Sequence, residues 1–152
     1  MSVAVRSVQH TGLVVSSLDA SLAFYREMFG VEPDFVERSE GPGLDQATGL
    51  EGAVVKWAFV TLGSSRLELL EYEAPEGKAY AISSADVGCA HICLEVDDIH
   101  QAYEELAAKG VEFRTPPTKL DDPLKDYWMC HFVDPDGLPM ELFQLPSTAS
   151  SR

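Results

Sequence analysis

The chain has 152 residues and a net charge of −14, from 11 Lys and Arg against 25 Asp and Glu. This length suits one domain or two small modules, and the negative charge repels nucleic acid phosphates and anionic lipid head groups. No apolar run approaches the roughly 20 residues that span a bilayer. We therefore expect neither a nucleic acid nor a membrane as partner.

The cysteines and the N-terminus indicate a cytoplasmic protein. The three cysteines are odd in number and lack the spacing of a disulfide framework, which is typical of a reducing compartment. Residues 1–10 contain one Arg and no long apolar core, so we expect no signal peptide.

The first half of the chain is predicted to fold as β-α-β-β-β. Ser16 or Ser17 offers a helix N-cap, apolar residues then recur at helical spacing, and Gly30 stands where a helix ends. Pro33 confines the next strand to a sheet edge. The predicted elements are strands over 8–15, 31–36, 54–62 and 66–72, a helix over 18–29, a long loop over 38–52 and a turn over 63–65.

The second half repeats the same order after a connector over 73–88. Asp97 or Asp98 is the predicted helix N-cap, and Gly110 ends that helix. Asp134-Pro135-Asp136-Gly137 is a strong turn signal. The predicted elements are strands over 91–96, 111–114, 127–133 and 138–145, a loop over 115–126 and a polar tail over 147–152.

The two halves are an internal repeat. His10 aligns with His91 at the start of each half, and Leu67-Glu68-Leu69 aligns with Met140-Glu141-Leu142 near the end. A repeated supersecondary unit is the sequence signature of a duplicated fold. We therefore expect an α+β protein with one βαβββ module over 8–72 and a second over 89–145.

The repeat pairs two histidines with two glutamates. Strand side chains alternate between faces, and a pseudo-twofold arrangement of the modules would bring His10, Glu68, His91 and Glu141 together. A carboxylate among leucines is costly to bury without a partner. Imidazoles and carboxylates in this number form a good set for a divalent metal ion, so these four residues are the predicted ligands.

This ordered set of motifs resembles the vicinal oxygen chelate superfamily, the glyoxalase and bleomycin-resistance fold. The resemblance runs from Val8 to Leu145, and its marks include the segment from Ser17 to Tyr25 and Asp134-Pro135-Asp136-Gly137 with Glu141 four residues beyond. It implies that 1–152 is a single domain whose two modules form one curved eight-stranded mixed sheet with the helices outside. The same four residues fall on the family's metal positions.

A divalent ion beside a carboxylate suits proton removal next to a carbonyl, with the enediolate stabilised by the metal. We therefore predict a metal-dependent epimerase or isomerase, or a glyoxalase-type lyase, with Glu141 or Glu68 as the base; the residues do not choose between the two. Cobalt, nickel, manganese, zinc and iron are all compatible with the ligands. The resemblance extends to substrates such as a cyclitol ketone (as in valiolone-type epimerases), methylmalonyl-CoA or a hemithioacetal.

Two alternatives remain open. His10, His91 and Glu141 resemble the metal-ligand set of an iron-dependent extradiol dioxygenase. Such enzymes usually lack a carboxylate where Glu68 stands. A non-catalytic antibiotic-binding protein uses the same cleft without a metal. Family likeness also implies a homodimer, and the sequence leaves open whether one chain or two complete the metal site.

Further residues are candidates for contact with a small-molecule substrate. His131 lies across the predicted turn from Glu141, and its face is ambiguous because one bulge reverses it. Tyr72 shares a face with Glu68. Cys89 and Cys93 flank His91 and are expected to act as small apolar fillers. The loops over 38–52 and 115–126 are candidates to cover the cleft.

Overall fold

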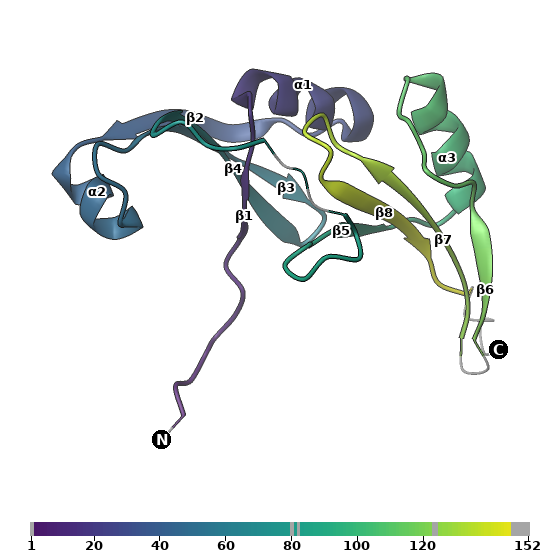
Figure 1. The fold of residues 1–152 in the computed structure, drawn as a ribbon. Helices are drawn as coiled ribbons and strands as arrows, with labels where there is room; N and C mark the ends of the chain where they lie inside the picture. The colour runs from purple at the N-terminus through teal and green to yellow at the C-terminus, as the bar shows by residue number, and fades with distance from the viewer. Residues whose placement is uncertain (1, 80, 82, 123–124, 147–152) are drawn as a thin grey trace. The chain divides into compact units, whose positions relative to one another are not determined.

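The computed structural model describes residues 2–79, 81, 83–122 and 125–146. The chain divides into two compact units, Met1–Ala79 (unit 1) and Tyr80–Arg152 (unit 2), and Figure 1 labels their elements. Unit 1 comprises β1 (Thr11–Val14), α1 (Leu18–Phe29), β2 (Pro33–Glu40), α2 (Pro42–Thr48), β3 (Val54–Leu62) and β4 (Ser65–Ala74). Unit 2 comprises β5 (Ile92–Glu95), α3 (Ile99–Ala108), β6 (Thr118–Asp122), β7 (Lys125–Val133) and β8 (Pro139–Gln144).

The units share one topology, which confirms the predicted pair of βαβββ modules. Strand order is β1-β4-β3-β2 in unit 1 and β5-β8-β7-β6 in unit 2. The first strand of each unit pairs in parallel with the last, and the other pairs are antiparallel. The α+β class is therefore as predicted, but the strands of the described residues are hydrogen-bonded as two four-stranded sheets and not as the one curved sheet that was expected.

Helices α1 and α3 begin where the sequence predicts. Ser17 caps α1 by accepting a hydrogen bond from the Ala20 N–H, and Gly30 ends the helix at φ 67°. Asp98 caps α3 by accepting from two backbone N–H groups. These are local side-chain and backbone preferences, so the sequence alone reveals them.

A second contact ties α1 and α3 each to the last strand of its unit. The Leu18 N–H donates to Glu71 Oε2 over 2.6 Å, and the Ile99 N–H donates to Gln144 Oε1 over 2.9 Å. Glu71 and Gln144 each lie three residues beyond the repeated glutamate of their unit. The duplicated sequence thus repeats this anchor as well, with a carboxylate in one unit and an amide in the other.

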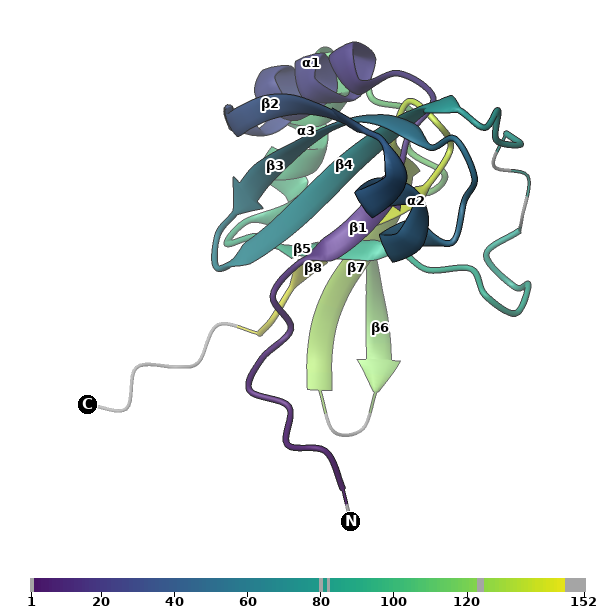
Figure 2. The same cartoon turned by 90° about the vertical axis from the view of Figure 1, so that its left-hand side faces the viewer.

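One face of each sheet is buried against its helix. In unit 1, α1 lies over this face, as Figure 2 shows. Its core consists of side chains at most 6% exposed: Leu18, Leu22, Tyr25, Ala58, Val60, Leu67 and Leu69. In unit 2 the corresponding residues are Ile99, Leu106, Cys130, Phe132, Met140 and Leu142. Because strand side chains alternate, Glu68 and Glu141 each lie on the face of their own sheet that points away from its helix. We call this the glutamate face.

The long loop predicted over 38–52 is wrong. Strand β2 continues to Glu40, and the short helix α2 follows. Pro42 favours a first helical turn, Gly49 ends the helix at φ 73°, and Asp45 accepts hydrogen bonds from the Gly52 and Ala53 N–H groups. The glycine content hid this element because two glycines are the caps of the helix.

The strand predicted over 111–114 is also wrong. Phe113 forms one isolated bridge with Phe132, and the edge strand of unit 2 is instead β6, inside the predicted loop over 115–126. Pro116 and Pro117 lack the N–H that a longer ladder would need, so pairing resumes only after them. The predicted tail over 147–152 lies outside the described residues. No helix in the described part of the chain is long and apolar enough to cross a membrane.

Candidate metal centre

In unit 1 the structure brings His10 and Glu68 together. Glu68 lies in the middle of β4 opposite Gly12 of β1, and His10 immediately precedes β1. His10 Nε2 is 3.2 Å from Glu68 Oε2. The other ring nitrogen, Nδ1, is hydrogen-bonded to Gln9 Oε1. Metal-binding histidines are commonly oriented through their second nitrogen in this way, which leaves Nε2 facing the carboxylate.

In unit 2 the corresponding pair is joined by a further histidine. His91 Nε2 lies 3.2 Å from Glu141 Oε2, and His131 Nε2 lies 3.7 Å from the same oxygen. His131 is the direct partner of Glu141 in the β7–β8 ladder. The strand register thus places His131 on the glutamate face, which the sequence left ambiguous.

The two glutamates differ in burial. The Glu141 side chain is 8% exposed and the Glu68 side chain 21%. Within the described residues, the ion-pair partners of Glu141 are His91 and His131. A buried carboxylate without a cationic Lys or Arg beside it is costly, and a divalent cation would offset that cost.

Thiols next to Glu141 stay protonated at neutral pH. Burial, followed by the charge of Glu141, raises the pKa of Cys93 to about 11, and the same two causes raise the pKa of Cys130 to about 11. Without a bound metal, both cysteines are therefore neutral thiols beside the carboxylate.

Tyr72 is the predicted substrate residue that the structure does not bring to a glutamate. It shares the face of Glu68, but it lies four strand residues away, about 13 Å along β4.

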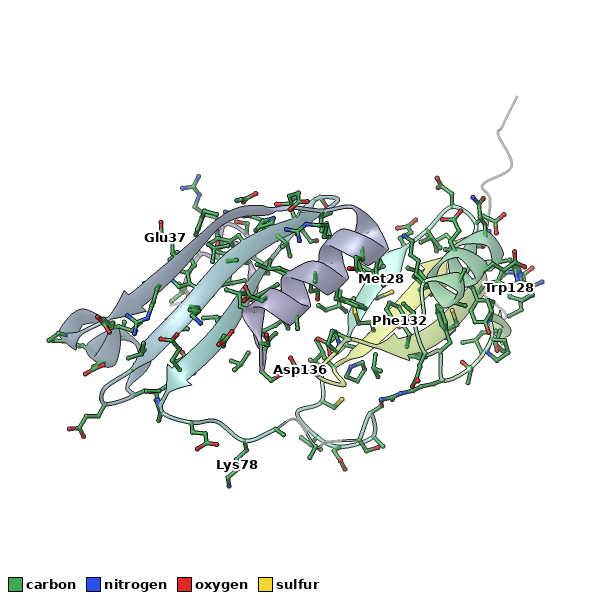
Figure 3. The ribbon with its side chains drawn as sticks, turned by 90° about the horizontal axis from the view of Figure 1, so that it is seen from above. Met28, Glu37, Lys78, Trp128, Phe132 and Asp136 are labelled. Atoms are coloured by element: carbon green, nitrogen blue, oxygen red, sulfur yellow. The ribbon has the colours of Figure 1, made fainter. Side chains whose placement is uncertain are left out.

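Trp57 of β3 lies on the same face, opposite Leu70. In unit 2, Trp128 instead contacts His100 of α3 with ring centroids 4.7 Å apart, and Figure 3 labels it beside that helix. Trp128 is therefore remote from the glutamate face.

Sequence reasoning missed Phe59, the direct ladder partner of Glu68. Its ring packs edge-on against His10 with centroids 5.4 Å apart. Phe59 and His131 occupy equivalent places in the two ladders, but the sequence repeat aligns Phe59 with Phe132, so only the register reveals the equivalence.

Each unit thus contributes one histidine–glutamate pair with the same atoms at the same separation. No three His, Cys, Asp or Glu side chains among the described residues are arranged to hold a metal ion. The chemistry of the donors fits a divalent metal, since neutral imidazole nitrogens and carboxylate oxygens are its usual protein ligands. One pair alone is half of such a ligand set.

Comparison with known proteins identifies the family. The model of the Glyoxalase/Bleomycin resistance protein/Dioxygenase superfamily matches residues 7–142. The chain belongs to this superfamily. The resemblance read from the sequence motifs is thereby confirmed.

Relatives of this chain in the superfamily include epimerases. A 2-epi-5-epi-valiolone epimerase from an Actinomyces species is 31% identical over 150 residues, covering 94% of this chain and 81% of the relative. Human mitochondrial methylmalonyl-CoA epimerase is 28% identical over 142 residues, covering 90% of this chain and 73% of the relative. These similarities support enzymatic activity in general terms.

A solved structure supports the fold. A glyoxalase family protein from Bacillus cereus matches with a TM-score of 0.81 at 23% identity, over 93% of this chain and 95% of that one. At this identity the match establishes the architecture alone.

Proposed function

We propose that this protein is a divalent-metal-dependent epimerase or isomerase that removes a proton beside a carbonyl group of a small molecule. The observation that carries the proposal is the duplicated pair, His10 with Glu68 and His91 with Glu141, each with Nε2 and Oε2 3.2 Å apart. We propose that these four residues bind one metal ion, either within one chain or across a homodimer.

The bound metal would supply Lewis-acid stabilisation of the negative charge that develops on the substrate's carbonyl oxygen. The chain's own residues do the rest. A carboxylate of Glu68 or Glu141 accepts the proton next to the carbonyl, as general base. Epimerisation needs a proton returned to the opposite face, and the other glutamate, in its carboxylic acid form, donates it. His131, which lies at Glu141, contacts the substrate.

We propose a neutral substrate, of the cyclitol ketone kind, over a coenzyme A or glutathione conjugate. The similarity to a valiolone epimerase supports this choice. The cation two residues from Glu68 on its own face, Arg66, is bound to Asp34 with Nη2 and Oδ2 2.8 Å apart. A cation already neutralised by an aspartate offers little attraction to a phosphate or carboxylate.

The test is elemental analysis of wild type, Glu68→Ala and Glu141→Ala, followed by solvent deuterium exchange into carbonyl substrates. We expect one divalent metal ion per chain, depleted in both variants, and metal-dependent exchange into cyclitol ketones. Tyr72→Phe is a control that should keep the metal. Two ions per chain would contradict a shared site. Retained iron with oxygen uptake would favour a dioxygenase, and no metal after reconstitution would favour a non-catalytic binding protein.

A further inference from the structure

Beside the His10–Glu68 pair, three aromatic side chains form a continuous surface on the same sheet face of unit 1. We propose that this aromatic wall, made of Phe35, Trp57 and Phe59, binds the hydrocarbon face of a neutral cyclic substrate and so determines specificity. The inference rests on the proposed function, because it concerns the substrate of the same site. It adds a subsite that the metal ligands do not explain.

The rings of the wall contact one another and reach the histidine. Phe35 and Trp57 pack with centroids 5.0 Å apart, and Phe59 lies 5.7 Å from Phe35 and 5.8 Å from Trp57. All three contacts are edge-on. Since Phe59 also packs edge-on against His10, the wall is continuous with the candidate metal centre of unit 1.

The strand register explains why these rings share the glutamate face. Phe59 pairs with Glu68 and Trp57 with Leu70 in the β3–β4 ladder. The alternate β3 residues Ala58 and Val60 point to the other face, where both are fully buried. The hydrophobic core of unit 1 therefore does not use the wall, and Phe35 remains 36% exposed.

Two polar side chains at the wall, those of Trp57 and Arg66, have partners within unit 1. The indole N–H of Trp57 donates to Ser39 Oγ over 3.0 Å. The Arg66 guanidinium lies 4.0 Å from the centroid of the Phe59 ring and pairs with Asp34. The wall thus offers π surfaces, and the exposed carboxylate of Glu37, the ladder partner of Trp57, lies at its side.

This chemistry selects a particular class of ligand. The C–H groups on one face of a polyhydroxylated ring are apolar and weakly positive, and they complement the negative face of an aromatic ring. An open-chain ketone of similar polarity presents no such face in a fixed shape, so it must lose more conformational freedom on binding. A cyclic polyol ketone therefore fits the wall better than a linear one.

Tryptophan fluorescence tests the proposal, because Trp128→Phe leaves Trp57 as the single tryptophan. In that background, metal-loaded protein is titrated with 2-keto-myo-inositol and with the linear ketose erythrulose. We expect a saturable change with the cyclic ketone and at least about tenfold weaker binding of the linear one. Phe35→Ala should weaken binding of the cyclic ketone about tenfold. Val36→Ala, which alters an exposed neighbour on the other face of β2, should not.

Three results would overturn the proposal that the wall binds substrate: no saturable change in fluorescence, equal affinity for both ketones, or equal effects of Phe35→Ala and Val36→Ala on affinity. Metal content and deuterium exchange of the same samples separate this inference from the proposed function. Metal binding and exchange with an unresponsive Trp57 would reject the wall alone. A fluorescence response in protein that binds no metal would reject the metal-dependent reaction and retain the wall.

Discussion

The two histidine–glutamate pairs stand on equivalent strands but in different surroundings. The ladder residue opposite the glutamate is the apolar Phe59 in unit 1 and the polar His131 in unit 2. Glu68 has one imidazole beside it and is 21% exposed, whereas Glu141 has two and is 8% exposed. The donor pair is thus the same in both units, while the ladder position opposite the glutamate is apolar in unit 1 and polar in unit 2.

A second difference lies on the parallel neighbour strand. Gly12 faces Glu68, and Cys93 faces Glu141. A Cβ at Gly12 would be 3.7 Å from Glu68 Oε2, so the glycine leaves room beside that carboxylate. The equivalent position beside Glu141 carries the side chain of Cys93. The comparison therefore predicts a mobile Glu68 and a fixed Glu141.

The largest expected difference between the two glutamates is the loss of metal affinity when the carboxylate charge is removed. We expect Glu141→Gln to weaken metal binding about 100-fold and Glu68→Gln about tenfold. The reason is that a buried charge in a less polar environment attracts a cation more strongly than an exposed one. Competition with a chelating dye measures both affinities. Equal losses would show that burial and the second imidazole do not distinguish the pairs.

Exchanging the ladder residues tests the next difference. His131→Phe gives unit 2 the residue of unit 1, and we expect deuterium exchange to slow about tenfold, the worth of one lost hydrogen bond to substrate. Metal affinity should stay at its wild-type value. If metal affinity falls in step with exchange, His131 is a metal ligand and its proposed substrate contact is wrong.

The sequence predicted those parts of the fold that depend on local chemistry. The helix caps Ser17 and Asp98 were visible because a short polar side chain at a helix start satisfies backbone N–H groups. The strand over 54–62 matched β3 because alternation and a following Gly63 mark its length. Helix α2 escaped detection because seven residues carry too little periodicity to recognise.

The candidate site was only partly predictable, for a different reason. Alternation along a strand gave the faces of Glu68 and Glu141, whereas the face of His131 depends on the register of a hairpin. Register is a tertiary property that a turn or a bulge can shift. The ring of Phe35 was missed for the same reason, since it comes from a strand whose own register is irregular.

The helix anchors should differ in strength between the units. Replacing Glu71 or Gln144 by Leu removes the acceptor for a helix N–H, which costs about 1 kcal/mol of unfolding free energy. Glu71→Leu should cost more, because its charge favours the positive end of α1 and pairs with Lys56 at 3.6 Å. Urea unfolding measures both. Glu71→Gln keeps the hydrogen-bond acceptor and should recover most of the unfolding free energy that Glu71→Leu loses. If it does not, the charge of Glu71 and not its hydrogen bond stabilises the start of α1.

The smallest expected effect concerns the turns that close the two hairpins. Unit 1 turns through Gly63 and Ser64, whereas unit 2 uses Asp134, which accepts hydrogen bonds from the Asp136 and Leu138 N–H groups. Figure 3 labels Asp136 in this turn. Burial raises the pKa of Asp134 above its ordinary value of 3.8, and the backbone hydrogen bonds only partly oppose it.

A raised pKa means that the folded protein holds this proton to higher pH than the unfolded chain. The stability from protonated Asp134 is therefore fully present below pH 3.8 and is lost as pH rises through the folded-state pKa. Asp134→Asn keeps the Oδ1 acceptor but cannot ionise, so we expect the variant to gain stability relative to wild type as pH rises. Urea unfolding of both proteins across this range measures the difference. Parallel stability curves would mean that Asp134 ionises alike in both states, and that the two turns differ in shape but not in electrostatic cost.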